Sequence, residues 1–179
     1  MAGPGDTALI IPFELPAELE SLRLRCVPDA LAGLSAHATV LYPFAKAEAL
    51  DDAMRSRLEG VISAHAEFAC RLVGLSRWPG VLYASVEPED PFRRLNADLL
   101  TAFPEFPSDN GGFEFVPHVT IAVGPAASAP ETASDPAWRE LPAVCRASRA
   151  DLIVRGQTGW DVKWSFAMSA PPTPHEPGQ

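Results

Sequence analysis

The sequence contains little positive charge. Its 179 residues include 14 Lys and Arg against 23 Asp and Glu, which gives a formal net charge of -9 at pH 7. No run of basic residues occurs in the chain, so the counterion release that drives binding to extended nucleic acid is missing. A small anionic ligand is still compatible with this charge, because a few oriented hydroxyls, imidazoles and amides can hold one phosphate. The charge therefore excludes an extended nucleic-acid surface.

Cysteines and long apolar runs are also scarce. The three cysteines, Cys26, Cys70 and Cys145, are odd in number and widely spaced, which fits neither a disulfide framework nor a zinc knuckle. We expect all three to be reduced and mostly buried. No stretch approaches the ~18 consecutive apolar residues that a membrane span needs, and the first ten residues lack the basic start of a secretory signal. We therefore expect a cytoplasmic protein that contacts no membrane.

The length and composition predict one folded domain with a short tail. A chain of 179 residues is close to the ~150 residues of a typical domain. The hydrophobic share of 47% and the charged share of 21% lie near globular averages, so a hydrophobic core can form. We place a single domain at residues 1–170 and expect residues 171–179, which are rich in proline, to form a disordered tail.

Strand and helix patterns alternate irregularly along the chain. Residue alternation and short apolar runs predict strands, and apolar residues at helical spacing predict helices. The expected strands cover residues 7–13, 37–42, 68–75, 81–86, 116–123, 148–155 and 160–168. The expected helices cover residues 15–25, 47–66 and 91–103, with a short helical patch around Trp138, a turn at 77–80 and a loop at 104–112.

One short pattern occurs twice. His37 and His118 are each the first residue of a tetrapeptide with the pattern H-x-T followed by a β-branched residue. The two copies, HATV and HVTI, lie 81 residues apart. Each copy falls inside a segment of strand character. Because the chain has only four histidines, it is a rare coincidence on composition alone that two of them precede Thr39 and Thr120 at this spacing. We therefore assign the chemistry of the protein to these two motifs.

Strand geometry explains why this spacing matters. Residues i and i+2 project from the same face of a strand, so each motif presents one imidazole and one hydroxyl side by side. Two such pairs from facing sheets would surround a tetrahedral anion with two titratable nitrogens and two hydroxyl donors. Because the pKa of histidine is about 6.5, one imidazole can be the neutral base and the other the protonated acid at neutral pH. The pattern predicts in-line cleavage of a phosphoester, which needs both groups on opposite sides of phosphorus.

The two motifs and their surroundings resemble a known family. HATVLYPF and PHVTIAVG resemble the two signature motifs of the 2H phosphoesterase superfamily, in particular its bacterial 2'-5' RNA ligase or RNA 2',3'-cyclic phosphodiesterase branch. The segments LRLRCVPDALAGLSAHATVLYPF, WPGVLYASVEPEDPF and FEFVPHVTIAVG resemble that branch in order and spacing, so the likeness spans residues 8–168. The resemblance implies an α+β, bilobal fold in which two pseudo-symmetric lobes place antiparallel sheets around a central cleft, with the helices outside.

The resemblance also implies roles for the four motif residues. His37 and His118 would act as general acid and base, and Thr39 and Thr120 would bind the phosphate. The implied reaction is metal-independent cleavage or formation of 2' phosphoester linkages, often the opening of a 2',3'-cyclic phosphate to a 2'-phosphate. We predict no metal, because two histidines without Cys, Asp or Glu ligands at the usual spacing are too few for zinc. We predict no cofactor either, since the chain has no Gly-rich phosphate loop.

Aromatic residues near the motifs are candidates for stacking on a nucleobase. Phe44 and Phe115 flank the motifs, and we expect them to reach the rim of the cleft. Strand parity places Tyr42 on the face opposite His37, which favours a role in core packing. Trp78 lies in a predicted turn and is interpreted as a packing residue. The other two histidines, at the end of a helix and in the tail, are interpreted as non-catalytic.

Together these observations predict a monomeric cyclic phosphodiesterase that acts on small nucleotides or RNA ends carrying a 2',3'-cyclic phosphate or a 2'-5' linkage. Two alternatives stay open. The first is the reverse reaction, 2'-5' ligation of RNA ends, which the acidic charge disfavours because two polynucleotide ends must enter the cleft. The second is a non-catalytic protein that binds nucleotides or other phosphorylated metabolites. The sequence leaves open which histidine is the acid and which is the base.

Overall fold

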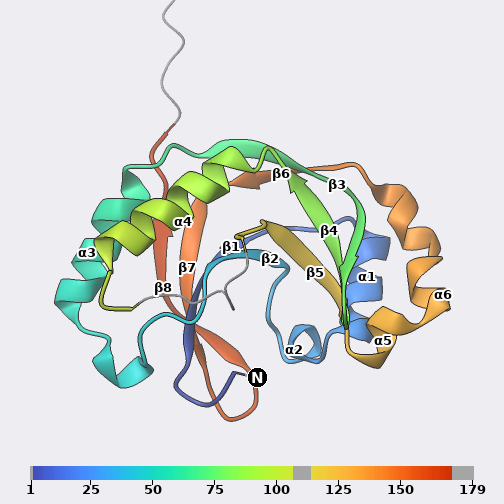
Figure 1. Cartoon of the computed structure of the whole chain (residues 1–179), viewed down its shortest axis with the longest axis horizontal. Coiled ribbons are helices and arrows are strands. Elements are labelled where there is room, and N and C mark those ends of the chain that lie inside the picture. Colours follow the sequence, from blue (N-terminus) through green and yellow to red (C-terminus); the bar gives the residue numbers. More distant parts are fainter. Residues whose placement is uncertain (1, 107–113, 171–179) are drawn as a thin grey trace, which may run out of the picture.

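The structure is a computed structural model and describes residues 2–106 and 114–170. The predicted tail at 171–179 and most of the predicted loop at 104–112 lie outside the described residues. Within this part of the chain, strands and helices combine into the α+β class expected from the sequence (Figure 1). No described helix is long and apolar enough to cross a membrane.

Eight strands form one continuous sheet in which every neighbouring pair is antiparallel. The order of strands across the sheet is β6-β3-β4-β5-β2-β1-β7-β8. In chain order the strands are β1 (Thr7–Pro12), β2 (His37–Leu41), β3 (Phe68–Trp78), β4 (Val81–Glu87), β5 (His118–Val123), β6 (Ala143–Ala147), β7 (Arg149–Arg155) and β8 (Trp160–Ala167). No described strand stands apart from this sheet.

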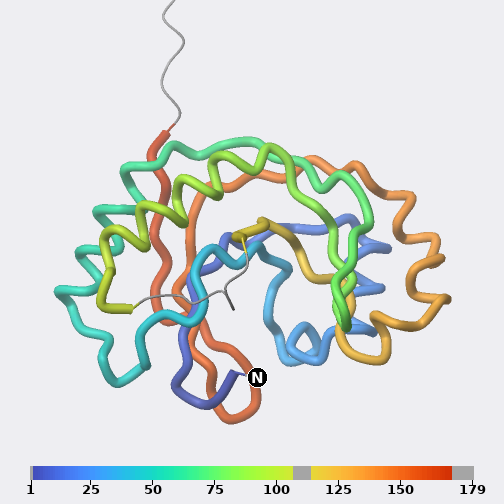
Figure 2. Tube along the Cα trace, in the orientation of Figure 1, coloured from blue at the N-terminus to red at the C-terminus, as the bar shows by residue number. Residues whose placement is uncertain are grey.

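The sheet consists of two halves that meet at its centre. The first half contains β2, β1, β7 and β8, and the second half contains β5, β4, β3 and β6, in mirrored order from the centre outward. The halves join where β2 and β5 pair through Ala38 and Val119. Figure 2 shows these two traces crossing the middle of the molecule beside each other, although they are far apart in the sequence. The two halves correspond to the two lobes that the resemblance implies.

The helices cover one face of the sheet, and two of them cross between the halves. Helix α1 (Ala17–Cys26) follows β1 of the first half but packs against β5 of the second. Helix α4 (Asp90–Ala102) follows β4 of the second half but packs against β2 of the first. Helix α3 (Asp52–Ser63) packs against β8 and α4 (Figure 1). Each crossing helix therefore covers the strand that carries the other half's motif.

The main hydrophobic core lies between the helices and this face of the sheet. One buried cluster combines apolar side chains of all three helices with those of the central strands, including Ala38 and Val40 from β2 and Val119 and Ile121 from β5. Burial of this apolar surface is the dominant favourable term in folding. Side chains alternate along β2 and β5, so the residues next to these four on each strand point to the opposite face of the sheet.

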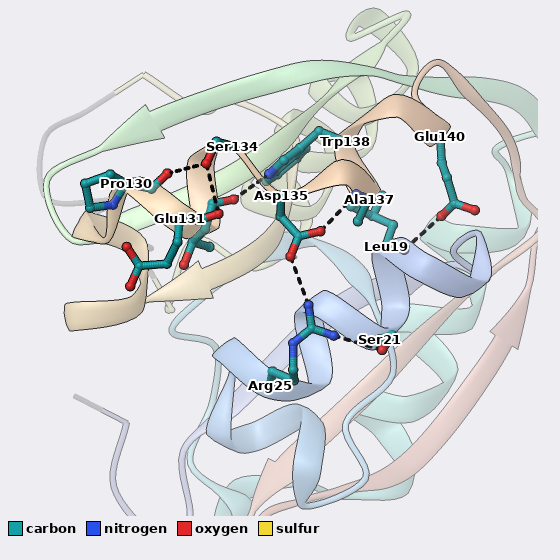
Figure 3. A network of polar contacts seen from close by, with 11 residues as sticks. Leu19, Ser21, Arg25, Pro130, Glu131, Ser134, Asp135, Ala137, Trp138 and Glu140 are labelled. Carbon is teal, nitrogen blue, oxygen red and sulfur yellow. Dashed lines mark hydrogen bonds and ion pairs between the residues drawn. The ribbon is translucent and has the colours of Figure 1, made fainter.

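Short helical segments fill the connections. These are α2 (Pro28–Leu31), α5 (Pro125–Ser128), α6 (Pro130–Ala133), and the 3-10 helices η1 (Ala47–Ala49) and η3 (Pro136–Glu140). Figure 3 shows how the segment from α6 to η3 is tied to α1. Asp135 accepts hydrogen bonds from the backbone N–H of Ala137 and from Arg25, and Glu140 accepts one from the backbone N–H of Leu19. The connection before β6 thereby holds α1 in place.

One expected element differs from the structure, and one strand of the structure was not expected. The helix predicted over 47–66 is wrong in its first turn, because Asp51 adopts an extended backbone and caps α3 by accepting a hydrogen bond from the N–H of Met54. The residues before it form only η1. Strand β6 was not predicted at all. Buried and exposed residues alternate along the whole of β6, but the inward residues are small and give a weak hydrophobic signal.

The remaining elements agree with the sequence within a few residues. The predicted turn at 77–80 is shorter in the structure, because β3 continues to Trp78. All three cysteines are free, as expected. Cys70 and Cys145 are buried and Cys26 is partly buried.

Candidate active site

The pairing of β2 with β5 brings the two motifs together. The pair Ala38 and Val119 fixes an antiparallel register. Counting one residue outward on each strand places His37 beside Thr120 and Thr39 beside His118. Side chains of such cross-strand neighbours lie on the same face of a sheet. Each imidazole therefore has the hydroxyl of the other motif as its neighbour, in addition to the one on its own strand.

The four motif side chains face a cavity rather than the core. Val40 and Ile121 are buried beneath the helices, whereas His37, Thr39, His118 and Thr120 are only partly buried, and all four line one cavity of about 1070 Å³. This is at the upper end of the usual size of ligand sites. The structure thus brings together all four residues that the sequence singles out.

Both imidazoles are oriented by the same contact. The Nδ1 of His37 lies 2.8 Å from the carbonyl oxygen of Ser35, and the Nδ1 of His118 lies 2.8 Å from the carbonyl oxygen of Val116. A carbonyl oxygen can only accept, so each Nδ1 carries the hydrogen and donates it. In the neutral ring this leaves Nε2 as an unprotonated acceptor. The two rings therefore offer equivalent nitrogen atoms to a ligand.

Burial disfavours the charged form of both imidazoles. Burial, together with the positive charges of Arg23 and of a protonated His118, lowers the pKa of His37 to about 4, although the hydrogen bond to Ser35 and the charge of Asp29 act in the opposite direction. Burial also lowers the pKa of His118. Both rings are therefore neutral at pH 7 when no anion is bound. A bound phosphodiester would reverse this effect, because a negative charge nearby stabilises an imidazolium.

Aromatic rings form the wall beside His118. The ring of Trp78 lies edge-on to the imidazole, with centroids 4.6 Å apart, and Tyr83 approaches it to 5.2 Å. Trp78 and Phe115 line the cavity. The interpretation of Trp78 as a packing residue of a turn is therefore wrong, because β3 extends to Trp78 and directs its ring to the site. The position of Trp78 depends on the register of β3 with β4, which a single sequence does not reveal.

Apolar side chains form the wall on the side of His37. Ala8, Ile10 and Ile153 make a small buried cluster with Tyr42 and Trp160 packed against it, and these residues line the cavity. The expectation that Tyr42 packs in the main core is wrong. Strand β2 ends at Leu41, so strand parity no longer applies one residue later.

Phe44 does not reach the site. Its ring is buried in the main core, where it packs edge-on against Phe103 at 5.1 Å and Phe106 at 5.4 Å. The expectation that it stacks on a base at the cleft rim is wrong. The chain turns back toward the core after β2. His65 pairs with Asp98 at 3.0 Å and does not line the cavity, and the fourth histidine lies outside the described residues.

One buried cation reaches the cavity. Arg23 of α1 is the only Lys or Arg among the described residues that line it. This residue was not predicted from the sequence, because neither motif has a basic neighbour along the chain. The available signal was the place of Arg23 in the helix, four residues after Leu19 on the apolar face. Within the described part of the chain, no group of three or more His, Cys, Asp or Glu side chains could hold a metal ion.

Comparison with known proteins identifies the family. The model of the 2'-5' RNA ligase superfamily matches residues 11–159 of the chain, a range that contains both motifs. The chain belongs to this superfamily. A comparison with curated protein sequences found no match to this chain.

Solved structures of related proteins share the fold. Escherichia coli LigT complexed with 3'-AMP is 16% identical, with a TM-score of 0.60, and the match covers 93% of this chain and 99% of that one. LigT complexed with NADP+ is 17% identical, with a TM-score of 0.57 and coverage of 94% and 99%. TT0787 of Thermus thermophilus is 16% identical, with a TM-score of 0.57 and coverage of 92% and 98%. The predicted LigT-like, bilobal 2H phosphoesterase fold is confirmed.

Proposed function

We propose that this superfamily member is a metal-independent phosphodiesterase that hydrolyses 2',3'-cyclic phosphates or 2'-5' linkages of small nucleotides or RNA ends. The observation that carries the proposal is the pair of imidazoles on adjacent strands, each with Nδ1 bonded to a backbone carbonyl and Nε2 free to exchange a proton. Hydrolysis of a phosphodiester by acid-base catalysis needs one neutral and one protonated group on either side of phosphorus.

In the proposed reaction, one neutral imidazole takes a proton from water as the water oxygen forms a bond to phosphorus. The other imidazole, protonated in the presence of the anionic substrate, gives its proton to the leaving ribose oxygen as the old bond breaks. Thr39 and Thr120 donate their hydroxyl hydrogens to the non-bridging oxygens, where charge develops in the transition state. Each positioned proton transfer contributes roughly 10²- to 10⁴-fold in rate.

The surroundings of the site support a small substrate. The net charge is -9, and Arg23, the one cation of the described cavity lining, has its donors directed to protein carbonyls and a carboxylate. Long RNA would find no row of cations to neutralise its phosphates. The rings of Trp78 and Phe115 offer faces for a nucleobase. LigT, which has the same fold, has been crystallised with the nucleotides 3'-AMP and NADP+.

The proposal includes a monomer that works in the cytoplasm, with residues 1–170 as one functional unit. Two other functions remain as alternatives. The reverse reaction would ligate RNA ends, and this superfamily takes its name from that activity. A protein without catalysis would bind nucleotides through the same groups, and tight product binding without turnover would identify it.

The test is a substrate panel of 2',3'-cyclic mononucleotides, 2'-5' dinucleotides and paired RNA ends, with products identified as 2'- or 3'-phosphates. We expect turnover by the wild type, unchanged by EDTA, and a kcat/KM roughly 10²- to 10⁴-fold lower for His37→Ala or His118→Ala. The matched control is His65→Ala, which removes a histidine outside the cavity and keeps full activity. Abolition of turnover by EDTA would contradict the metal-free reaction, and joining of RNA ends would favour the ligase.

A further inference from the structure

Arg23 is an unusual residue because its charge is almost completely buried. Only 2% of its surface is exposed. Its Nη1 donates to Glu20 Oε1 at 3.0 Å, and its Nη2 donates to the carbonyl oxygens of Leu34 at 2.7 Å and Ser35 at 3.0 Å. Burying a charge is costly unless it is paired and hydrogen-bonded. Stability alone does not require a cation here, since a well-packed apolar side chain would avoid this cost.

The carbonyl of Ser35 connects Arg23 to the active site. This oxygen accepts the hydrogen of His37 Nδ1 at 2.8 Å and also the bond from Arg23 Nη2. A carbonyl oxygen has two lone pairs, so the two donors use both of them. Arg23 thereby fixes the carbonyl that orients the imidazole.

Helix α1 holds Arg23 rigidly in this position. The N–H of Leu19 donates to Glu140 at 2.8 Å, and Arg25 donates to Asp135 at 3.0 Å, as Figure 3 shows. Both acceptors belong to the connection that leads into β6. The helix is thus tied at both ends, and its guanidinium cannot follow a shift of the segment before β2.

The other histidine lacks an equivalent contact. The carbonyl of Val116 accepts the hydrogen of His118 Nδ1, but no side chain among the described residues donates to that oxygen. The charges that act on His37 come from three elements: Arg23 on α1, Asp29 on α2 and His118 on β5. Arg23 and a protonated His118 oppose protonation of His37, whereas the hydrogen bond to Ser35 and the charge of Asp29 favour it. For His118, burial is the cause that opposes protonation.

We propose that Arg23 is a positioning residue for His37: its guanidinium locks the Ser35 carbonyl that holds the imidazole. Its positive charge adds to the burial that disfavours the charged form of the ring. This inference rests on the catalytic function proposed above, because the position of His37 matters for activity only if His37 takes part in the reaction. Its test, however, is made on the imidazole itself and needs no substrate.

The experiment follows the titration of each imidazole by NMR in the full-length protein. Removing Arg23 alone would leave the partly buried Glu20 without its partner, so the informative variant is Glu20→Gln/Arg23→Gln, compared with Glu20→Gln. We expect the pKa of His37 to rise by about half a unit to one unit when the positive charge is lost. The pKa of His118 should stay within about 0.2 units of its wild-type value, which also reports that the protein is folded.

Two further variants separate charge from geometry. Arg23→Lys keeps the charge, but its side chain is shorter and lacks the planar guanidinium that holds Glu20 and the two carbonyls at once, so we expect a wild-type pKa for His37 with a kcat about tenfold lower. The signal of the Nδ1–H tautomer should weaken in the same variant. Arg25→Gln is the matched control, because Arg25 lies on the same helix, is largely exposed and does not contact Ser35. It should change neither reading.

The outcomes distinguish the two proposals. An unchanged pKa of His37 in the double variant would show that Arg23 serves packing alone and would overturn the inference. If the double variant does not fold, Arg23→Lys decides, since a wild-type tautomer signal and wild-type kcat would overturn the inference equally. If the imidazole responds as expected but no phosphodiester is cleaved by the wild type, the role of Arg23 stands and the proposed reaction is wrong.

Discussion

The two halves of the sheet present the same two chemical groups, an imidazole and a hydroxyl, in different surroundings. In the first half, His37 lies between the apolar wall around Ile10 and the buried cation Arg23. In the second half, His118 lies against the rings of Trp78 and Tyr83. The hydrogen bond from Nδ1 to the carbonyl two residues earlier is the same in both. Duplicated motifs therefore supply equivalent atoms, and these atoms have unlike neighbours in the two halves.

This difference is what an acid-base pair requires. Two identical imidazoles would titrate together, and neither would be reliably the acid or the base. Environments that separate two pKa values assign one proton to one of the two groups. Substitutions and pH changes in each half can show how far this asymmetry controls function.

The largest effect is expected from removing either imidazole. His37→Asn and His118→Asn should each lower kcat/KM by roughly 10²- to 10⁴-fold, because each removes one positioned proton transfer. The pH profile of the remaining activity should lose one of its two limbs, a different one in each variant. The measurement is steady-state kinetics from about pH 4 to pH 9 on a 2',3'-cyclic nucleotide. Full activity in either variant would exclude the two-histidine reaction.

The hydroxyls should matter less than the imidazoles and equally in both halves. Thr39→Val and Thr120→Val keep the shape and strand preference of the side chain but remove the donor. We expect kcat to fall by about 10²-fold in each, the usual effect of losing one donor to a developing negative charge. The control is the unfolding midpoint of each variant, which should remain close to that of the wild type. A fall in only one variant would mean that a single half binds the phosphate.

The next effect concerns stability in acid. The pKa of His37 is about 6.5 in the unfolded chain and about 4 in the fold, so between these values the unfolded state binds more protons. The stability that the neutral ring contributes is therefore complete above pH 6.5 and is lost as the pH falls toward 4. From about pH 8 to pH 5 we expect a loss of about 2 kcal/mol from this residue. Urea unfolding of the wild type and His37→Asn at both pH values should show this difference, and parallel losses would contradict it.

The smallest effect is expected from the aromatic wall. Trp78→Leu should raise KM for a nucleotide by about tenfold with little change in kcat, the loss of one base stacked on a ring. Trp160→Leu makes the same substitution in the first half, where we expect a weaker effect. A larger rise in KM for Trp160→Leu would place the base on the opposite side of the phosphate.

The sequence was sufficient to predict the fold class and the four motif residues that the structure brings together at one cavity. A repeated H-x-T pattern on strands is a local signal, since strand parity alone puts His37 and Thr39 on one face. Most strands and the helix around Leu95 follow from periodicity in the same way. These features depend on residues that are close in sequence.

The walls of the site could not be predicted in this way. Trp78 reaches His118 through the register of β3, β4 and β5, and Arg23 reaches Ser35 across the space between a helix and a loop. Such contacts depend on long-range pairing, which a single sequence does not encode as a pattern. Phe44 and Tyr42 were misplaced for a related reason, because the chain leaves β2 at Leu41 and strand parity ends there.

The crossing of α1 and α4 between the halves has a consequence for how the protein selects ligands. Within the sheet, the ladder between β2 and β5 has a single register pair, Ala38 and Val119, a joint that could bend if it stood alone. Because α1 packs on β5 and α4 packs on β2, any opening of that joint would pull buried apolar surface into water. The crossing helices thus hold the two imidazoles at a set separation, and under the proposed function this separation would decide which phosphodiesters fit between them.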